Sequence, residues 1–209
     1  MDSHVKERGP KAVIGLIVKV LILLIASVFT VFPFVWMVLS SLKTKEELMD
    51  SSQFLPSSPQ WSNITSILFD SPIPKYIFNS LAVSIIIVAL QLVTGAMITY
   101  AIVFMKTKLS SILFAIIMAT YMLPVAATYI PSYIILSDMN LLNTLSGVVV
   151  SSTVSIFGIF LLRQAFMQVP TGLQEAALMD GAGPWRILWS VIFPMTKSSF
   201  ITFGLMSFI

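Results

Sequence analysis

The chain has 209 residues, of which 57% are hydrophobic and only 10% are charged; it contains one histidine and no cysteine. A soluble domain carries about 25% charged residues, so this composition excludes an ordinary water-soluble fold and favours a membrane protein. It also excludes disulfides and thiolate metal sites, and neither a metal nor a cofactor is expected. The net charge of +3 is scattered along the chain rather than clustered on one face, which argues against nucleic acid as a partner.

The first 12 residues are predicted to be a cytoplasmic tail. The apolar run that follows is too long for a signal-peptide core and lacks a small-residue cleavage site, so an uncleaved membrane span is favoured. Four gaps between successive charged residues are each longer than the roughly 20 residues that cross a bilayer core. They predict an all-α bundle with spans at residues 13–39, 77–104, 110–132 and 144–167.

The basic residues predict the orientation of these spans. Lysines and arginines lie before the first span, just after the second and around the end of the fourth, whereas the short connection at residues 133–143 has none. The longer first connection, rich in proline and serine, has lysines balanced by acidic residues. Because positively charged loops stay in the cytoplasm, the N-terminus is expected inside.

A polar stretch interrupts the apolar pattern after the fourth span, at residues 170–194. Thr171 and Gln174 have the spacing of a capping box, which predicts a helix that begins at Gly172. The helix is expected to end near Asp180 because Gly181 supplies a stop. A helix this short is marginal alone in water, so it needs something to pack against.

Two environments are open to this short helix. It could lie on the bilayer surface, but such helices carry Lys or Arg on the polar face and bulky residues on the other. Here Ala176 and Ala177 share a face with Leu173 and Asp180, beside Glu175. Small side chains permit close approach and the carboxylate offers a charge, so a protein partner is favoured.

The segment "EAALMDGAGPWRILWSVIFP" resembles the EAA loop of permease subunits in bacterial and archaeal ATP-binding-cassette importers. Conservative apolar departures occur at Val191 and Phe193. Three further segments resemble the carbohydrate-uptake branch related to the maltose transporter: "FPFVWMVLSSLKTKEEL", "FNSLAVSIIIVALQLVTGAMITYAIVFMK" and "IPSYIILSDMNLLNTLSGVVV". The resemblance is carried in the loop by Glu175, Ala176, Ala177, Gly181 and Pro194.

This resemblance implies a cell-membrane permease that forms part of the path for a carbohydrate or related solute. It implies three protein partners: a cytoplasmic ATP-binding subunit, a second permease subunit and an extracellular or periplasmic solute-binding protein. By analogy, Glu175 would pair with a basic residue of the ATPase, Ala176 and Ala177 would give the close fit, and Gly181 would turn the chain back to the membrane. Asp180 and Pro194 belong to the same coupling loop.

The chain itself is expected to be no enzyme, since it has no GxxxxGK[ST] phosphate loop and ATP hydrolysis must lie elsewhere. Two other classes stay open: an ATP-independent secondary transporter or channel, and a non-transporting membrane scaffold. An inverted repeat would favour the former, but no long segment recurs.

Polar residues inside spans are candidates for the solute path. Each also has a packing explanation, because uncharged polar side chains commonly tie membrane helices together. A fifth span is expected at residues 198–209 but would reach only about 18 Å, so we expect a six-helix type in which the fifth span is incomplete and the sixth is absent, as in a truncated product or fragment. The path candidates are Asn79, Gln91, Thr94, Thr120, Tyr121 and, at the end of the fourth span, Gln164.

Overall fold

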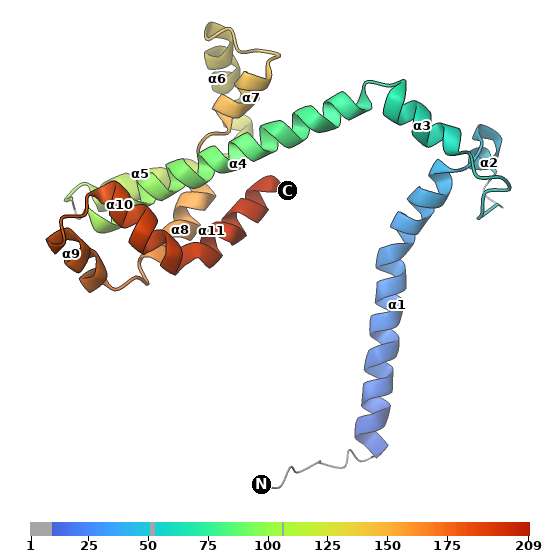
Figure 1. Cartoon of the computed structure of the whole chain (residues 1–209), viewed down its shortest axis with the longest axis horizontal. Coiled ribbons are helices and arrows are strands. Elements are labelled where there is room, and N and C mark those ends of the chain that lie inside the picture. Colours follow the sequence, from blue (N-terminus) through green and yellow to red (C-terminus); the bar gives the residue numbers. More distant parts are fainter. Residues whose placement is uncertain (1–9, 51–52, 106) are drawn as a thin grey trace. The chain divides into compact units, whose positions relative to one another are not determined.

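The computed structural model describes residues 10–50, 53–105 and 107–209, with backbone only for residues 10–13. Throughout the described residues the regular structure is helical and no strand occurs, which confirms the all-α class (Figure 1). The chain divides after Pro74 into two compact units, and each is treated by itself. The single histidine of the sequence, His4, lies outside the described residues.

The first unit is built on α1 (Pro10–Ser41), which is followed by two short helices, α2 (Lys45–Met49) and α3 (Trp61–Phe69). Residues 14–41 of α1 form an apolar stretch long enough to cross a membrane. Pro33 lies inside α1 without ending it. The first expected span, at residues 13–39, falls within this helix.

A buried lysine holds the connection after α1 in place. Lys43 is only 2% exposed; its Nζ donates to the Gln53 carbonyl oxygen at 2.5 Å and lies 4.5 Å from the centre of the Trp36 ring. The Asn63 amide donates to the carbonyl oxygens of Ser41 and Lys43, both at 3.0 Å. A buried ammonium group is tolerated when its charge is shared in this way between a carbonyl and an aromatic face.

The second unit contains the remaining helices. The long α4 is a continuous apolar helix of 32 residues and includes the second expected span. The helices of this unit are α4 (Ile73–Phe104), α5 (Ser110–Tyr121), α6 (Val125–Asp138), α7 (Leu145–Ser151), α8 (Ile156–Phe166), α9 (Thr171–Met179), α10 (Pro184–Ile187), the π-helical turn η1 (Leu188–Ile192) and α11 (Phe193–Phe208).

The third and fourth expected spans are each a pair of helices rather than one. The axes of α5 and α6 differ by 100° across Pro124, and those of α7 and α8 differ by 44° across residues 152–155. Proline has no N–H to donate and its ring clashes with the preceding turn, which accounts for the first break. Thr153 and Ser155 favour the second, because their hydroxyls bond locally: Thr153 to the Val149 carbonyl, and Ser155 as acceptor from the Gly158 N–H.

The structure also differs from the expected fifth span. Residues 198–209 are not a separate remnant: α10, η1 and α11 run together as a 25-residue helical stretch from Pro184 to Phe208, long and apolar enough to cross a membrane. The π turn explains how Pro194 is accommodated. Phe193 donates its N–H to the Leu188 carbonyl, five residues back, and this register slip comes directly before the proline that cannot donate.

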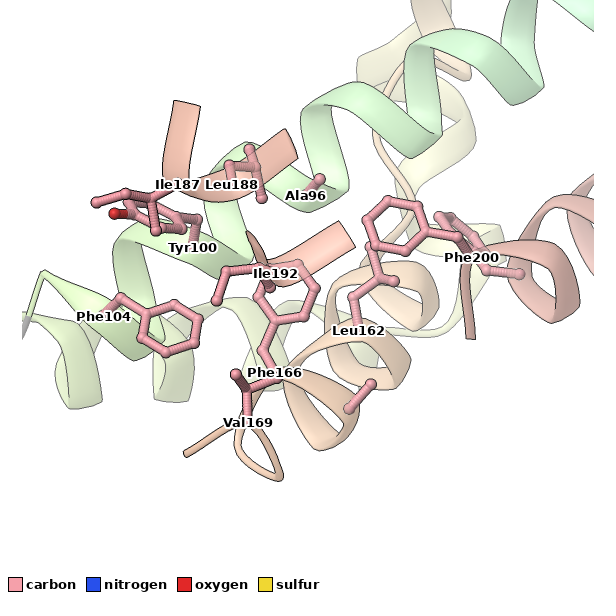
Figure 2. Packing of buried hydrophobic residues seen from close by; sticks show 12 residues of the cluster. Ala96, Tyr100, Phe104, Leu162, Phe166, Val169, Ile187, Leu188, Ile192 and Phe200 are labelled. Atoms are coloured by element: carbon pink, nitrogen blue, oxygen red, sulfur yellow. The ribbon is translucent and has the colours of Figure 1, made fainter. Parts of the chain in front are cut away.

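The hydrophobic core of this unit lies where the C-terminal half of α4, α8 and the α10–α11 stretch meet (Figure 2). Phe166 is fully buried between Phe104 and Phe200, with ring centres 6.1 Å from each. Leu162 packs against α4 at Gly95, where an added Cβ would lie 3.4 Å from Leu162 Cδ1, at the near limit of an ordinary contact. These contacts fix the helix ends from which the 170–194 segment departs.

Candidate functional site

The polar segment at residues 170–194 contains one well-formed short helix, α9, closed by a Schellman motif. Gly181 has φ +75°, the left-handed conformation that favours glycine. Its N–H bonds to the Leu178 carbonyl at 3.0 Å, and the N–H of Ala182 bonds to the Ala177 carbonyl at 2.9 Å. The structure therefore agrees with the expected helix stop at Gly181, and also with a new helix beginning at Pro184.

The expected capping box at the start of α9 is wrong. Pro170 is the N-cap residue and has no side-chain cap, so Thr171 is already inside the helix. This shift by one residue turns Gln174 away from the helix start. Its side chain is 8% exposed and its Nε2 donates to the Phe104 carbonyl at the end of α4, at 3.4 Å.

The two alanines of α9 face different surroundings. Ala177 is half-buried and packs against the chain's own core, together with Ala182. Ala176, Glu175 and Asp180 are exposed. The resemblance implied that both alanines give a close fit to a partner, but here only Ala176 lies on the outward surface.

Sequence reasoning missed the apolar part of that outward surface. Leu178 is 49% exposed and Met179 is 88% exposed, beside the exposed Leu173. For Met179 the available signal was its position on the helical wheel, nearly opposite Ala177. Leu178 lies one turn after Gln174, at the edge of the buried face, so the wheel gave no such signal for it. Exposed apolar side chains next to a carboxylate form a surface suited to a protein partner.

Of the path candidates, two instead join α4 to the broken pair α7–α8. Gln91 donates from Nε2 to the Ser152 carbonyl at 2.7 Å, and Thr94 donates from Oγ1 to the Thr153 carbonyl at 2.9 Å. These carbonyls lie at the break, where the end of α7 leaves backbone oxygens without helical partners. Gln91 and Thr94 therefore hold helices together.

The other candidates lie apart from that contact. The Thr120 hydroxyl donates to the Ile117 carbonyl of its own helix, and Asn79 is half-buried in α4. Gln164 is exposed on α8. Tyr121 is 61% exposed at the α5–α6 break and lines a largely apolar cavity of about 280 Å³ with Met118, Ile156, Phe157 and Phe160.

The long apolar helices and the two bent helix pairs define the class as a multi-pass membrane protein. Residues 91–209 match the family described as "Binding-protein-dependent transport system inner membrane component". The chain belongs to this family. This is a family of transporter permeases and not a family of enzymes.

Curated relatives span most of this chain. It is 29% identical over 184 residues to the lactose transport system permease protein LacG of Rhizobium radiobacter, covering 88% of this chain and 67% of the relative. It is 28% identical over 190 residues to the diacetylchitobiose uptake system permease protein NgcG of Streptomyces coelicolor, covering 90% and 63%. It is 29% identical over 194 residues to the sn-glycerol-3-phosphate transport system permease protein UgpE of Yersinia enterocolitica, covering 90% and 69%. The chain thus spans about two thirds of the length of these relatives.

A solved structure shares the fold. It is the crystal structure of a bacterial ABC transporter involved in the import of the acidic polysaccharide alginate, with a TM-score of 0.78 and 25% identity. The match covers 95% of this chain and 71% of the other. Together with the family, it identifies the fold as that of a permease from an ATP-binding-cassette importer.

Proposed function

We propose that the chain forms part of the translocation path of an importer for a sugar or related small solute, and that a separate ATPase drives it through α9. The observation that carries this proposal is the outward surface of α9, defined here as Leu173, Glu175, Ala176, Leu178 and Met179. This α9 surface is exposed, whereas the opposite side of the same helix packs on the core.

The chemistry of the α9 surface suits a folded partner with a basic group and an apolar groove. Glu175 supplies a charge, Ala176 permits close approach, and Met179 adapts to an irregular apolar surface. Glu175 would pair with a lysine or arginine of the ATPase. The helix is stopped at both ends, by Pro170 and by the Schellman motif at Gly181, so it can act as a rigid lever.

Carbohydrate is the proposed substrate class. Two of the relatives are named for a disaccharide, lactose and diacetylchitobiose, and the similar solved transporter is named for a polysaccharide. A third relative is named for sn-glycerol-3-phosphate, so a phosphorylated polyol is the comparison that a substrate test must include. Delivery would come from a solute-binding protein on the outer side, and a second permease subunit would complete the path.

The orientation with the N-terminus in the cytoplasm is part of the proposal. It puts α9 on the cytoplasmic side, where ATP is available. Asp180 and Pro194 keep their proposed places in the coupling loop: Asp180 is the C-cap residue of α9, and Pro194 lies in the first turn of α11.

The test is an ATPase pull-down with two single variants. Glu175→Lys reverses the exposed charge and is expected to weaken association of the ATPase by roughly tenfold or more, because it places like charges together. Gly181→Val forces a β-branched residue into the left-handed conformation, which costs about 1–2 kcal/mol or more and misdirects the chain after α9. Both variants are expected to insert into the membrane normally and to lose transport.

Glu46→Lys is the matched control, since it makes the same charge change at an exposed residue of the first unit. Undiminished association and transport in both α9 variants would contradict the assigned residues. Sugar-stimulated ATP hydrolysis in the reconstituted assembly separates the classes: a secondary transporter or channel would move solute without ATP, and a scaffold would move none.

A further inference from the structure

The carbonyl end of α4 is capped by a side chain that arrives from α9. Helix α4 ends at Phe104, and the last four carbonyls of any helix lack partners within it. The Gln174 Nε2 donates to the Phe104 carbonyl across 70 positions of sequence. Gln174 therefore caps the C-terminal end of α4, a helix long enough to cross a membrane, and not an end of α9.

This contact is buried and has a second partner. Gln174 is 8% exposed, and the Tyr100 side chain, one turn before the end of α4, also interacts with it by hydrogen bonding. Tyr100 is itself 6% exposed and lies beside Ile187 and Leu188 in the core (Figure 2). Burying a polar side chain without its hydrogen bonds costs free energy, so the contact between Gln174 and the end of α4 resists separation.

The other contacts of α9 with the core are small and apolar. Ala177 and Ala182 pack against it without direction, so they permit sliding. Within the described residues, Gln174 is the one residue of α9 whose side chain hydrogen-bonds to another helix. Gln174 is therefore the contact that fixes the register of α9 on α4.

The same long helix reaches the broken pair α7–α8. Gln91 and Thr94 of α4 bond to the carbonyls of Ser152 and Thr153 at that break. A helix transmits displacement along its axis because its backbone bonds are continuous. A continuous set of directional contacts thus runs from α9 through Gln174 and α4 to an interrupted membrane helix.

We propose that Gln174 is a positioning residue that makes α9 and α4 move as one body, so that displacement of α9 by the ATPase is carried to the α7–α8 break. The proposal rests on the proposed function, because it takes the ATPase as the source of the displacement. It concerns Gln174, which has no part in the α9 surface that would face the ATPase.

The test compares three variants in the assembled transporter. Gln174→Met keeps length and flexibility but removes the donor, and Gln174→Lys restores a donor to the Phe104 carbonyl. Gln168→Met is the matched control, since Gln168 is exposed after α8. We expect Gln174→Met to retain ATPase association but to lower the solute moved per ATP hydrolysed by about fivefold, the effect of one buried hydrogen bond; Gln174→Lys recovers most of it, and the control is unchanged.

A distance measurement separates coupling from folding. The chain has no cysteine, so single cysteines at Gly172 in α9 and at the exposed Met97 in α4 can carry spin labels specifically. A Cβ added at position 172 would have no atom within 4 Å apart from its chain neighbours and the nearby backbone of α9. In the chain that keeps Gln174, the distance between the two labels is expected to be the same with and without ATP. In Gln174→Met this distance should change when ATP binds.

Either of two results would overturn the proposal. One is an α9–α4 distance that already changes with ATP when Gln174 is present; the other is a parental coupling ratio in Gln174→Met. If the ATPase failed to bind the chain with unaltered Gln174, that result would instead contradict the proposed function. It would also remove the assumption that the ATPase displaces α9. That outcome appears before any Gln174 variant is made, so the two failures are distinguishable.

Discussion

At the residue scale, a close approach of α11 to α8 in the second unit depends on Gly158. A Cβ added there would lie 1.9 Å from Cζ of Phe203 and within 2.5 Å of two more atoms of that ring. Phe203 is only 1% exposed, so its ring cannot simply move aside. The absence of a side chain at Gly158 is what lets the tip of the Phe203 ring of α11 reach the backbone of α8.

We predict that Gly158→Ala destabilises the purified protein by about 1–3 kcal/mol, the usual cost of overpacking a tight core. The measurement is the thermal unfolding midpoint in detergent. Gly204→Ala is the control on α11, because its Cβ would lie 3.7 Å from Leu92 Cδ1, an ordinary contact. Equal midpoints for the two variants would show that the Phe203 ring is free to rearrange.

The residues of the 170–194 segment show which site features follow from local sequence. Gly181 permits the left-handed conformation of a helix stop, and Pro184 fixes its own φ at a helical value, so a stop and a new start could be predicted there. The role of Gln174 could not, because its partner is a carbonyl that folding brings from α4. The false capping box arose from the same limit: spacing alone fits Thr171 as N-cap, whereas Pro170 takes that place.

At the element scale, the five-residue helix α2 exists only because its start is capped. The Thr44 hydroxyl accepts from the Glu47 N–H at 3.2 Å, and the Glu47 carboxylate accepts from the Thr44 N–H at 3.0 Å. The other carboxylate oxygen accepts from the Ser57 N–H at 2.9 Å, which ties α2 to the following loop. A helix of this length has no stability of its own without such bonds.

These bonds predict a pH dependence for α2. The backbone N–H of Thr44, and then the contacts with Ser57, hold the pKa of Glu47 below its ordinary value of 4.5. Because the pKa is lower in the folded state, the stabilisation is complete above 4.5 and is lost as the pH falls through the folded-state value. We therefore expect the Thr44 and Ser57 amides to lose protection from hydrogen exchange on acidification. Protection here is the ratio of the exchange rate in the unfolded chain to that in the folded protein at the same pH.

Glu47→Gln should lower this protection at neutral pH and remove its dependence on acid. Glu46→Gln is the control, since Glu46 is exposed on the same helix. A protection profile for Glu47→Gln that still followed that of the parent chain would show that another group controls α2.

The long helices and the broken ones differ in how far hydropathy predicts them. Helices α1 and α4 were predicted because each is one uninterrupted apolar run, and only their ends differ by a few residues. The breaks between α5 and α6 and between α7 and α8 lie inside equally apolar runs, so charge spacing passes over them. The start of the last stretch was missed for the opposite reason: the expected span at residues 198–209 begins just after the charged Lys197, yet Lys197 lies inside α11.

At the scale of the whole molecule, the helix breaks decide how many times the chain crosses the membrane. Three continuous stretches in the described part are long and apolar enough to cross, or five if each bent pair counts as one span. If both pairs cross, or if both turn back as re-entrant loops, α9 stays on the same side as residues 107–109. The connection between α6 and α7 changes sides between those two arrangements, so it is the position that discriminates.

We predict five crossings with the N-terminus in the cytoplasm, because the connection between α6 and α7 has no basic residue whereas the segments that flank α4, α8 and α9 on the opposite side do. Since the chain has no cysteine, single replacements report each side by reaction with a membrane-impermeant maleimide. Ser58→Cys and Met139→Cys should react in intact cells, and Gly172→Cys only after permeabilisation. If Met139→Cys were protected in intact cells while Ser58→Cys still reacted, α5 and α6 would form a re-entrant loop and would not cross the membrane. If Gly172→Cys reacted from outside, α9 would lie on the outer side, where a cytoplasmic ATPase could not reach it.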